Sequence, residues 1–444
     1  MASYVFYGAW SFSFLSLLLA ATALNYYCGG KIHKASDLKR KKVFLYLGVF
    51  GNLIILGFFK YCDFFIGNLI SLLQYFNLSI QLRSLDIILP IGISFYILQS
   101  LGYTIDVYRK RINPTKRFLD FALFVAFFPQ LMAGPIERAA HLLPQISFLR
   151  RMTLTKFYQG CYLIFWGLFL KVVIADNLAK IVNVNFAANP PYDGVMVLLS
   201  LYAFAFQIFC DFAGYSNIAR GLGKVMGFDI MINFNLPYFA KNPKEFWQRW
   251  HISLSSWFRD YVYIPLGGSR KGQLTTCINL SITMLLCGLW HGAAWTFVAW
   301  GAYHGALLIV HRLLMPFLGK LPSPKNVLLE KLWTFARTIF FFHLICLGWL
   351  IFRAESIRQA YYLFRGLISN FSFSLNINAA GTLLTISAFV WALLAAQLMQ
   401  HFKRNPLFVL NLNPAARVCF YTFCLLCFII FGVSSGEEFI YFSF

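Results

Sequence analysis

The chain has 444 residues, of which 59% are apolar and only 12% are charged. A soluble globular protein carries about 25% charged residues, so this composition excludes a soluble domain with an ordinary water-facing surface. The formal charge is +22, but the basic residues lie in short loops between apolar runs and no nucleic-acid-binding motif accompanies them, so we interpret the charge as membrane orientation and contact with anionic lipid.

Long apolar runs follow one another along the chain, and roughly 20 such residues cross a bilayer as a helix. We therefore expect an all-α integral membrane protein with about 11 transmembrane helices plus re-entrant or interfacial helices. The predicted spans are residues 4–27, 43–60, 86–107, 118–134, 156–175, 193–213, 274–290, 292–315, 332–352, 381–401 and 417–435. Shorter apolar segments, predicted to be partial or interfacial, are residues 62–79, 217–228, 246–265 and 359–369.

The first run lacks a positively charged leader and a small-residue cleavage site, so we expect a retained helix rather than a removed signal peptide. Basic residues crowd the loop from Lys31 to Lys42, which predicts a cytoplasmic loop and an extracytoplasmic N-terminus. The next basic loop, Arg109 to Arg117, is also cytoplasmic if residues 62–79 do not span. Parity therefore predicts that residues 62–79 lie along or dip into the outer surface.

The ten cysteines mostly lie inside apolar runs, and Cys424 and Cys427 form a C-x-x-C pair in the last predicted helix. No second pair stands at metal-binding distance, so we expect core packing rather than a disulfide framework or a zinc site.

Residues 229–272 are too polar for an ordinary span and too apolar for a solvated loop. Such backbone survives at membrane depth only when it is buried in protein or lines a wet cavity. We therefore predict that this segment folds back into the helical bundle. Residues 229–305 would form a re-entrant catalytic core within a single membrane domain of residues 1–444.

Three clusters of ionisable residues stand out, because such residues at membrane depth indicate function by default. The segment from Phe246 to Arg270 packs Arg249, His251, Arg259 and Asp260 among tryptophans. Arg259 and Asp260 are adjacent, so on a helix they are not expected to face each other. An interfacial amphipathic helix with snorkelling arginines explains the segment equally well.

The second cluster contains His291, which lies between two apolar runs and is flanked by Gly288 and Gly292. A histidine at this depth is suited to act as a general base, although a buried histidine bonded to a neighbouring helix is the commoner case. His304 and His311 would lie about 10.5 Å apart along a helix, and His291 and His304 about 20 Å apart if the helix is continuous. This helix alone therefore does not predict a metal site.

The third cluster is the segment from Gln207 to Ser216, in which Asp211 ends a strongly apolar run. Two interpretations remain open: Asp211 pairs with an arginine in the bundle, or it marks the end of a helix.

At these residues the sequence resembles the membrane-bound O-acyltransferase family, most closely the bacterial branch of alginate O-acetylation, peptidoglycan O-acetylation and teichoic acid D-alanylation membrane proteins. The resemblance runs from about Leu89 to the C-terminus. The motifs that carry it are Leu89–Arg109, Phe127–Ala139, Cys210–Phe228, Asn233–Arg270 (NFNLPYFAKNPKEFWQRWHISLSSWFRDYVYIPLGGSR), Gly288–Gly305 (GLWHGAAWTFVAWGAYHG), Trp349–Ser356 and Phe439–Phe444.

The resemblance implies a ring of helices around a central tunnel, with a funnel opening on each side. It implies that His291, in the W-H-G element, is the catalytic histidine and that His251, in the R-W-H element, is a second residue linked to activity. Oxyanion donors would come from Asn242, His251 or Arg249. The further residues assigned to substrate or to the tunnel are Trp250, Ser255, Arg259, Asp260, Trp290 and Asp211.

The implied activity moves an acetyl group from a cytoplasmic thioester donor, acetyl-CoA or an acyl carrier protein, to an extracytoplasmic acceptor. No cofactor would be bound. The product would be an O-acetylated envelope polysaccharide of the alginate, peptidoglycan or exopolysaccharide type in a bacterial inner membrane. No hydrolase-like domain is appended, so a separate extracytoplasmic acetyltransferase or esterase-like partner is expected.

Two alternatives remain. The first is transfer of D-alanine from a carrier protein to teichoic acid. The second is a transporter or channel, which two inverted halves or paired broken helices would favour. Neither pattern is visible in the sequence.

Overall fold

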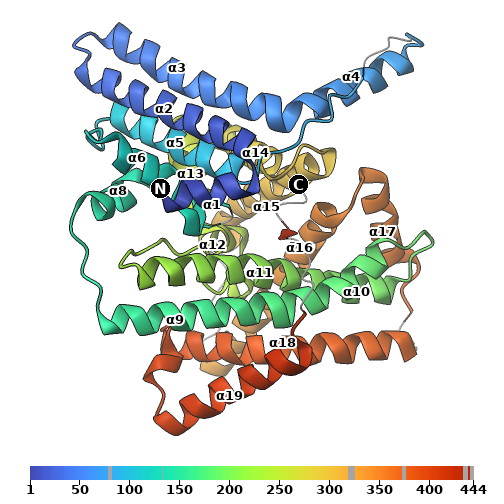
Figure 1. Cartoon of the computed structure of the whole chain (residues 1–444). Coiled ribbons are helices and arrows are strands. Elements are labelled where there is room, and N and C mark those ends of the chain that lie inside the picture. Colours follow the sequence, from blue (N-terminus) through green and yellow to red (C-terminus); the bar gives the residue numbers. More distant parts are fainter. Residues whose placement is uncertain (79–82, 133, 319–325, 373–376, 434–438, 441–444) are drawn as a thin grey trace. The chain divides into compact units, whose positions relative to one another are not determined.

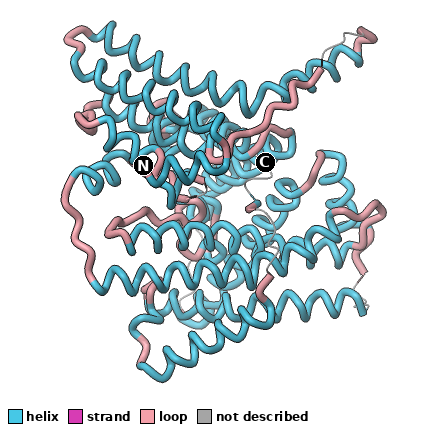
Figure 2. The backbone as a smooth tube through the Cα atoms, viewed as in Figure 1, coloured by secondary structure: helices cyan, strands magenta, loops and turns pink. Residues whose placement is uncertain are grey.

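The computed structural model describes residues 1–78, 83–132, 134–318, 326–372, 377–433 and 439–440. The described residues form helices and loops without strands (Figure 2). Within them, nine helices are long and apolar enough to cross a membrane. The protein is therefore an all-α, multi-spanning membrane protein, as its composition predicts, although these nine spans differ from the eleven expected runs.

The chain divides into two compact units. The first combines Met1–Phe157 with Leu222–Met231. Its helices α2 and α3 lie side by side (Figure 1) and are joined by buried amides, because Asn52 Nδ2 donates to Asn25 Oδ1 at 2.9 Å. Thr104 of α5 donates to the same oxygen at 2.8 Å. The helices of this unit are α1 (Ala2–Trp10), α2 (Phe12–Lys34), α3 (Leu38–Leu56), η1 (Gly57–Tyr61), α4 (Cys62–Tyr75), α5 (Ile93–Tyr108), α6 (Phe118–Val125), α7 (Phe128–Leu131) and α8 (Ala139–Ser147).

The second unit comprises Tyr158–Gly221 and Ile232–Phe444. Helix α9 continues through η2 into α10, so that residues Leu154–Phe186 form one long span. This span packs tightly on α11, because a Cβ on Gly167 would lie 2.6 Å from the Gly214 carbonyl oxygen. Small residues permit such close backbone approach between membrane helices.

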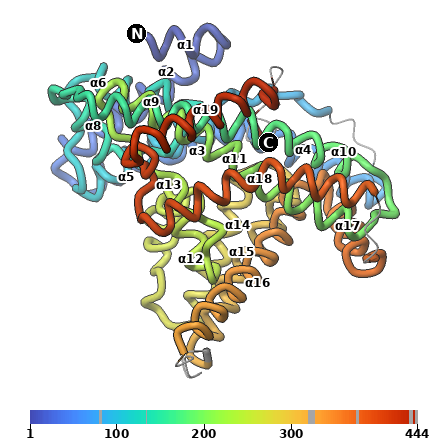
Figure 3. The backbone as a smooth tube through the Cα atoms, turned by 90° about the horizontal axis from the view of Figure 1, so that it is seen from below, coloured from blue at the N-terminus to red at the C-terminus, as the bar shows by residue number. Residues whose placement is uncertain are grey.

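The helices of the second unit that precede the histidine region are α9 (Leu154–Leu168), η2 (Phe169–Ala175), α10 (Asp176–Phe186), α11 (Gly194–Val225), η3 (Pro237–Phe239), α12 (Pro243–Trp247), α13 (Ile252–Phe258) and η4 (Arg259–Tyr263). Those that follow are α14 (Gln273–His291), α15 (Trp295–Leu318), α16 (Val327–Arg353), α17 (Ile357–Ser369), α18 (Ile377–Lys403), η5 (Phe408–Asn411) and α19 (Pro414–Phe431). Helices α14, α15 and α16 run side by side in sequence order (Figure 3).

Two expected spans are interrupted. The helix expected over 4–27 breaks at Ser11, which has an extended φ of −156° and caps α2 through Phe14 N. The helix expected over 118–134 breaks between α6 and α7, and residue 133 lies outside the described residues. Proline is well tolerated in the first turn of a helix, and Pro129 stands at the start of α7.

Two of the segments predicted to be partial or interfacial, residues 62–79 and 217–228, continue the helix that precedes them. Helix α4 continues α3 through η1, and α11 runs on to Val225. Neither run contains a proline that would interrupt the helix. Helix α5 instead starts late, at Ile93, after Gly92 adopts a left-handed φ of 76°.

Candidate active site

Helices α14 and α15 form a tight hairpin that places His291 at its turn. Helix α14 ends at His291 and α15 begins at Trp295. A Cβ on Gly288 would collide with the Phe297 carbonyl oxygen, so the two backbones are in direct contact there. The separation of about 20 Å expected for His291 and His304 assumed one continuous helix. It does not apply, because the helix breaks between His291 and Trp295. Both histidine rings contact Trp300, with centroids 5.0 Å and 4.7 Å away.

His251 occupies a strained backbone position just before α13. Its φ of 41° and ψ of 55° are left-handed, a region that non-glycine residues seldom adopt and that surrounding structure must enforce. The side chain is fully buried.

Asn233 holds the turn that contains His251. Its backbone oxygen accepts from Ile252 N at 2.9 Å, and its Oδ1 accepts from Ser253 Oγ at 2.6 Å. Its Nδ2 donates to Ser216 Oγ on α11 at 3.1 Å. Asn233 therefore links the two residues that follow His251 to a long membrane helix.

The two histidine rings lie close together in an aromatic environment. Their centroids are 6.4 Å apart, and Trp290 lies 5.7 Å from His251 and 5.0 Å from His291. Phe212 approaches His251 edge-on at 4.6 Å, and Phe352 approaches His291 at 5.4 Å. Burial lowers the pKa of His251 to about 3, so this ring is neutral at physiological pH.

Trp250 belongs to the aromatic packing that surrounds this pair. It is fully buried and stacks on Phe246 at 5.7 Å with an interplanar angle of 13°. Its ring also lies 4.8 Å from Trp349 of α16, which in turn lies 6.1 Å from Trp300. Trp250 and Trp290 are thus the predicted tryptophans that the structure places around the histidines.

Three other predicted residues stabilise their own segment. Asn242 caps α12 by accepting from Glu245 N at 2.9 Å, and Ser255 Oγ donates to the Trp250 carbonyl at 3.0 Å. Arg249 donates to Glu245 at 2.8 Å and to the Asn235 carbonyl at 3.2 Å. Each side chain therefore has a structural task in the fold.

Arg259 and Asp260 form an ion pair, with Arg259 Nε donating to Asp260 Oδ1 at 2.8 Å. The expectation that adjacent residues would not face each other is therefore wrong. An arginine side chain is long enough to fold back onto its neighbour, and the Arg259 side chain is 63% exposed.

Asp211 lies within α11, which continues to Val225, so it does not mark a helix end. Its partner is a lysine rather than an arginine: Lys171 Nζ lies 2.9 Å from Asp211 and 2.8 Å from Asp176. Asp211 Oδ2 also accepts from Ile440 N at 2.8 Å. Sequence reasoning missed Lys171, although a lone lysine within an apolar span was the available signal.

The buried ion cluster of Lys171, Asp176 and Asp211 is connected to the histidine region through aromatic contacts. Phe439 precedes the residue bound by Asp211, and its ring lies 5.7 Å from Phe212, which packs against His251. The rest of the predicted closing motif, residues 441–444, lies outside the described residues.

The described part of the chain contains no group of three His, Cys, Asp or Glu side chains that could hold a metal ion. The site contains two imidazoles, an indole that contacts both rings and an aromatic surround.

Several known proteins resemble this chain over most of its length. The profile of the membrane-bound O-acyltransferase family, MBOAT, matches residues 109–352, which include both histidines. The probable alginate O-acetylase AlgI of Azotobacter vinelandii is 44% identical over 83% of this chain and 71% of its own length. The peptidoglycan O-acetyltransferase of Helicobacter pylori is 36% identical over 83% of this chain and 72% of its own length.

A more distant relative is the teichoic acid D-alanyltransferase of Bacillus subtilis, which is 31% identical over 52% of this chain and 60% of its own length. The matched region spans more than half of the chain and contains the paired histidines and their aromatic surround. The resemblance expected from the motifs is thereby confirmed, and the chain belongs to the membrane-bound O-acyltransferase family and is an acyltransferase.

Proposed function

We propose that this protein transfers an acetyl group from a cytoplasmic thioester donor to an extracytoplasmic acceptor or partner, for O-acetylation of an envelope polysaccharide. The observation that carries the proposal is the buried pair of imidazoles, His251 and His291, whose centroids are 6.4 Å apart. The relatives that share most of the chain are named for O-acetylation of alginate or peptidoglycan, which supports acetyl as the transferred group.

In this mechanism His291 is the general base. Its imidazole takes the proton of an acceptor hydroxyl while the hydroxyl oxygen attacks the thioester carbonyl carbon. The tetrahedral intermediate then breaks the carbon–sulfur bond, and the imidazolium returns the proton to the leaving thiolate. The products are an ester and a free thiol, and the histidine is regenerated.

His251 is the proposed oxyanion donor. Because burial keeps its ring neutral, one ring nitrogen carries a hydrogen that can donate to the negative oxygen of the intermediate. Trp290 packs against both rings and would fix their mutual orientation. Asn242 and Arg249 are weaker candidates for this role, since both already hold the backbone of their own segment.

The setting that we propose is a bacterial inner membrane, with an extracytoplasmic N-terminus and a central tunnel lined by the 229–305 region. Basic loops would attract the phosphates of acetyl-CoA or an acidic carrier protein. A separate extracytoplasmic acetyltransferase or esterase-like protein would receive the acetyl group. Transfer of D-alanine is the second candidate, supported by the teichoic acid D-alanyltransferase relative.

Replacing His291 with alanine tests the proposal. We expect the alkali-releasable acetate of isolated envelope polysaccharide to fall to background, while His251→Ala lowers it by about 10²-fold or more. His311→Ala is the matched control, because His311 lies on α15 and is only half-buried. Immunoblotting of membranes checks that the variants accumulate equally. Normal acetate in the His291→Ala strain would remove this residue from the base role.

A further inference from the structure

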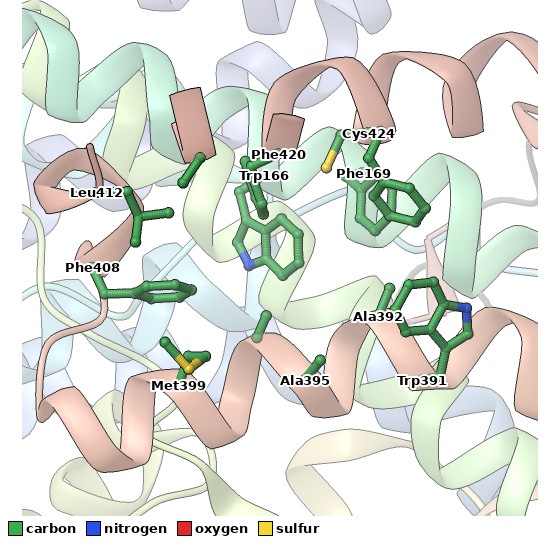
Figure 4. Close-up of a pocket in the computed structure, with 13 residues that line it drawn as sticks. Trp166, Phe169, Trp391, Ala392, Ala395, Met399, Phe408, Leu412, Phe420 and Cys424 are labelled. Atoms are coloured by element: carbon green, nitrogen blue, oxygen red, sulfur yellow. The ribbon is translucent and has the colours of Figure 1, made fainter. Parts of the chain in front are cut away.

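The second unit contains an apolar cavity of about 340 Å³ between α18, α19 and the α9–η2 helix (Figure 4). Trp166, Phe169 and Phe420 form one side, and Ala395 and Met399 of α18 lie opposite. The cavity is separate from the histidine site, whose residues do not line it.

The cavity exists because α18 presents short side chains where its neighbours present aromatic rings. Ala392, Ala395 and Ala396 stand three and four positions apart, so they share one face of the helix. Trp391, at the same face, is 54% exposed, which leaves the cavity open at its edge. Both α18 and α19 qualify as membrane spans, so the opening faces hydrocarbon rather than water.

Positive charge gathers at one end of this cavity. Helix α18 finishes with Lys403, and exposed Arg404 follows directly. On α19, Arg417 donates to the carbonyl oxygens of Leu410 and Leu412 at 2.9 Å and 3.0 Å. Leu412 itself lines the cavity, so the arginine stands at the cavity's end.

The sequence around these cations adds no negative charge, since residues 356–436 contain no Asp or Glu. The ends of membrane spans lie at the level of lipid headgroups, where basic side chains bind lipid phosphates. The cavity end therefore combines an apolar slot with cations at headgroup depth.

We propose that this cavity binds one acyl chain of an anionic bilayer phospholipid, whose phosphate is held by Lys403, Arg404 and Arg417. An acyl chain restores the dispersion contacts that the short alanines leave unmade. The cations distinguish an anionic headgroup from a zwitterionic one. The site is independent of the proposed acetyl transfer, because no histidine of that site takes part.

The test uses the full chain purified in detergent. Native mass spectrometry measures retention of dioleoyl phosphatidylglycerol and of dioleoyl phosphatidylcholine, which carry the same acyl chains. We expect preferential retention of phosphatidylglycerol, weakened about fivefold by each of Lys403→Gln and Arg404→Gln. Ala395→Trp and the milder Ala395→Leu should fill the cavity and reduce retention of both lipids. Leu398→Trp is the control, since Leu398 is exposed on α18 and does not line the cavity.

Three outcomes would overturn the proposal. Equal retention of the two lipids in the wild-type protein would exclude recognition of an anionic headgroup. Unchanged retention in both Ala395 variants, with each protein eluting as a single folded species, would place the lipid elsewhere. Loss of a dimer or of a bound membrane helix in the Ala395 variants, without loss of lipid, would assign the cavity to a protein partner.

Discussion

His251 combines two unfavourable features, a left-handed φ of 41° and complete burial of an imidazole. Strain of this kind costs on the order of 1–3 kcal/mol and persists only where neighbouring contacts enforce it. Asn233 makes those contacts, through its backbone oxygen to Ile252 N and its Oδ1 to Ser253. At the scale of single residues, the position of His251 thus depends on both the backbone and the side chain of Asn233.

Replacing Asn233 with alanine should therefore displace His251. We expect kcat for acetyl transfer to fall at least about tenfold while KM for the donor changes little, because the lost interaction orients a group needed in the transition state. Stability should fall by about 1–3 kcal/mol, since Ser216 and Ser253 lose a buried partner.

The matched control for Asn233→Ala is Asn235→Ala. Asn235 is exposed and bonds to Arg249 only through its backbone atoms, which alanine retains. If both variants lose activity equally, general loosening of the segment explains the effect and Asn233 has no positioning role.

At the scale of elements, the α14–α15 hairpin decides where His291 lies. Gly288 and Gly301 let the two backbones touch, since a Cβ on Gly301 would collide with the Met284 carbonyl oxygen. This contact brings Trp300 against the His291 ring at 5.0 Å. Small residues at such crossings are the usual means of close packing in membranes.

Gly301→Ala should push the two helices apart. We expect a stability loss of about 1–3 kcal/mol, because the added methyl group meets backbone that cannot rotate away. Thermal unfolding of the detergent-solubilised protein measures the loss as a lower midpoint, and acetyl transfer should fall with it. Gly305→Ala, one turn further along α15, should behave like wild type, since its Cβ would lie 3.4 Å from Met284 Cβ. Equal midpoints for the two variants would contradict the close-packed hairpin.

The expected bounds of the helices are correct where the length of an apolar run alone sets them. They are wrong where a local feature of the backbone begins or ends the helix. Spans such as 274–290 and 332–352 agree with α14 and α16 to within a few residues. The break at Ser11 and the continuation of α3 into α4 depend on a cap and on packing. Composition averaged over a membrane span predicts neither the break at Ser11 nor the continuation of α3 into α4.

At the scale of the whole molecule, the described chain divides into two compact units, and both histidines belong to the second. The Lys171 cluster also belongs to it and binds the backbone of Ile440 through Asp211. Residues from α9 to Ile440 therefore pack around the region that holds both histidines.

The donor distinguishes acetyl transfer from D-alanyl transfer. We expect the purified protein to release free CoA slowly from acetyl-CoA, and the rate to fall to background in His291→Ala. Thiol release, followed with a thiol reagent, measures it directly. Turnover with a D-alanyl carrier protein, together with no release from acetyl-CoA, would favour the teichoic acid pathway instead.

The sequence by itself determined the membrane class, the family and the identity of His291 and His251 as residues of interest, because apolar run lengths and dense motifs are local properties of the chain. It could not determine that Lys171 pairs with Asp211, since these residues stand forty positions apart. Nor could it show that Asn233 braces His251, or that three alanines of α18 face aromatic rings and leave a cavity. Tertiary structure decided these features, because each depends on which helix faces lie together, and helix periodicity does not specify the partner of a face.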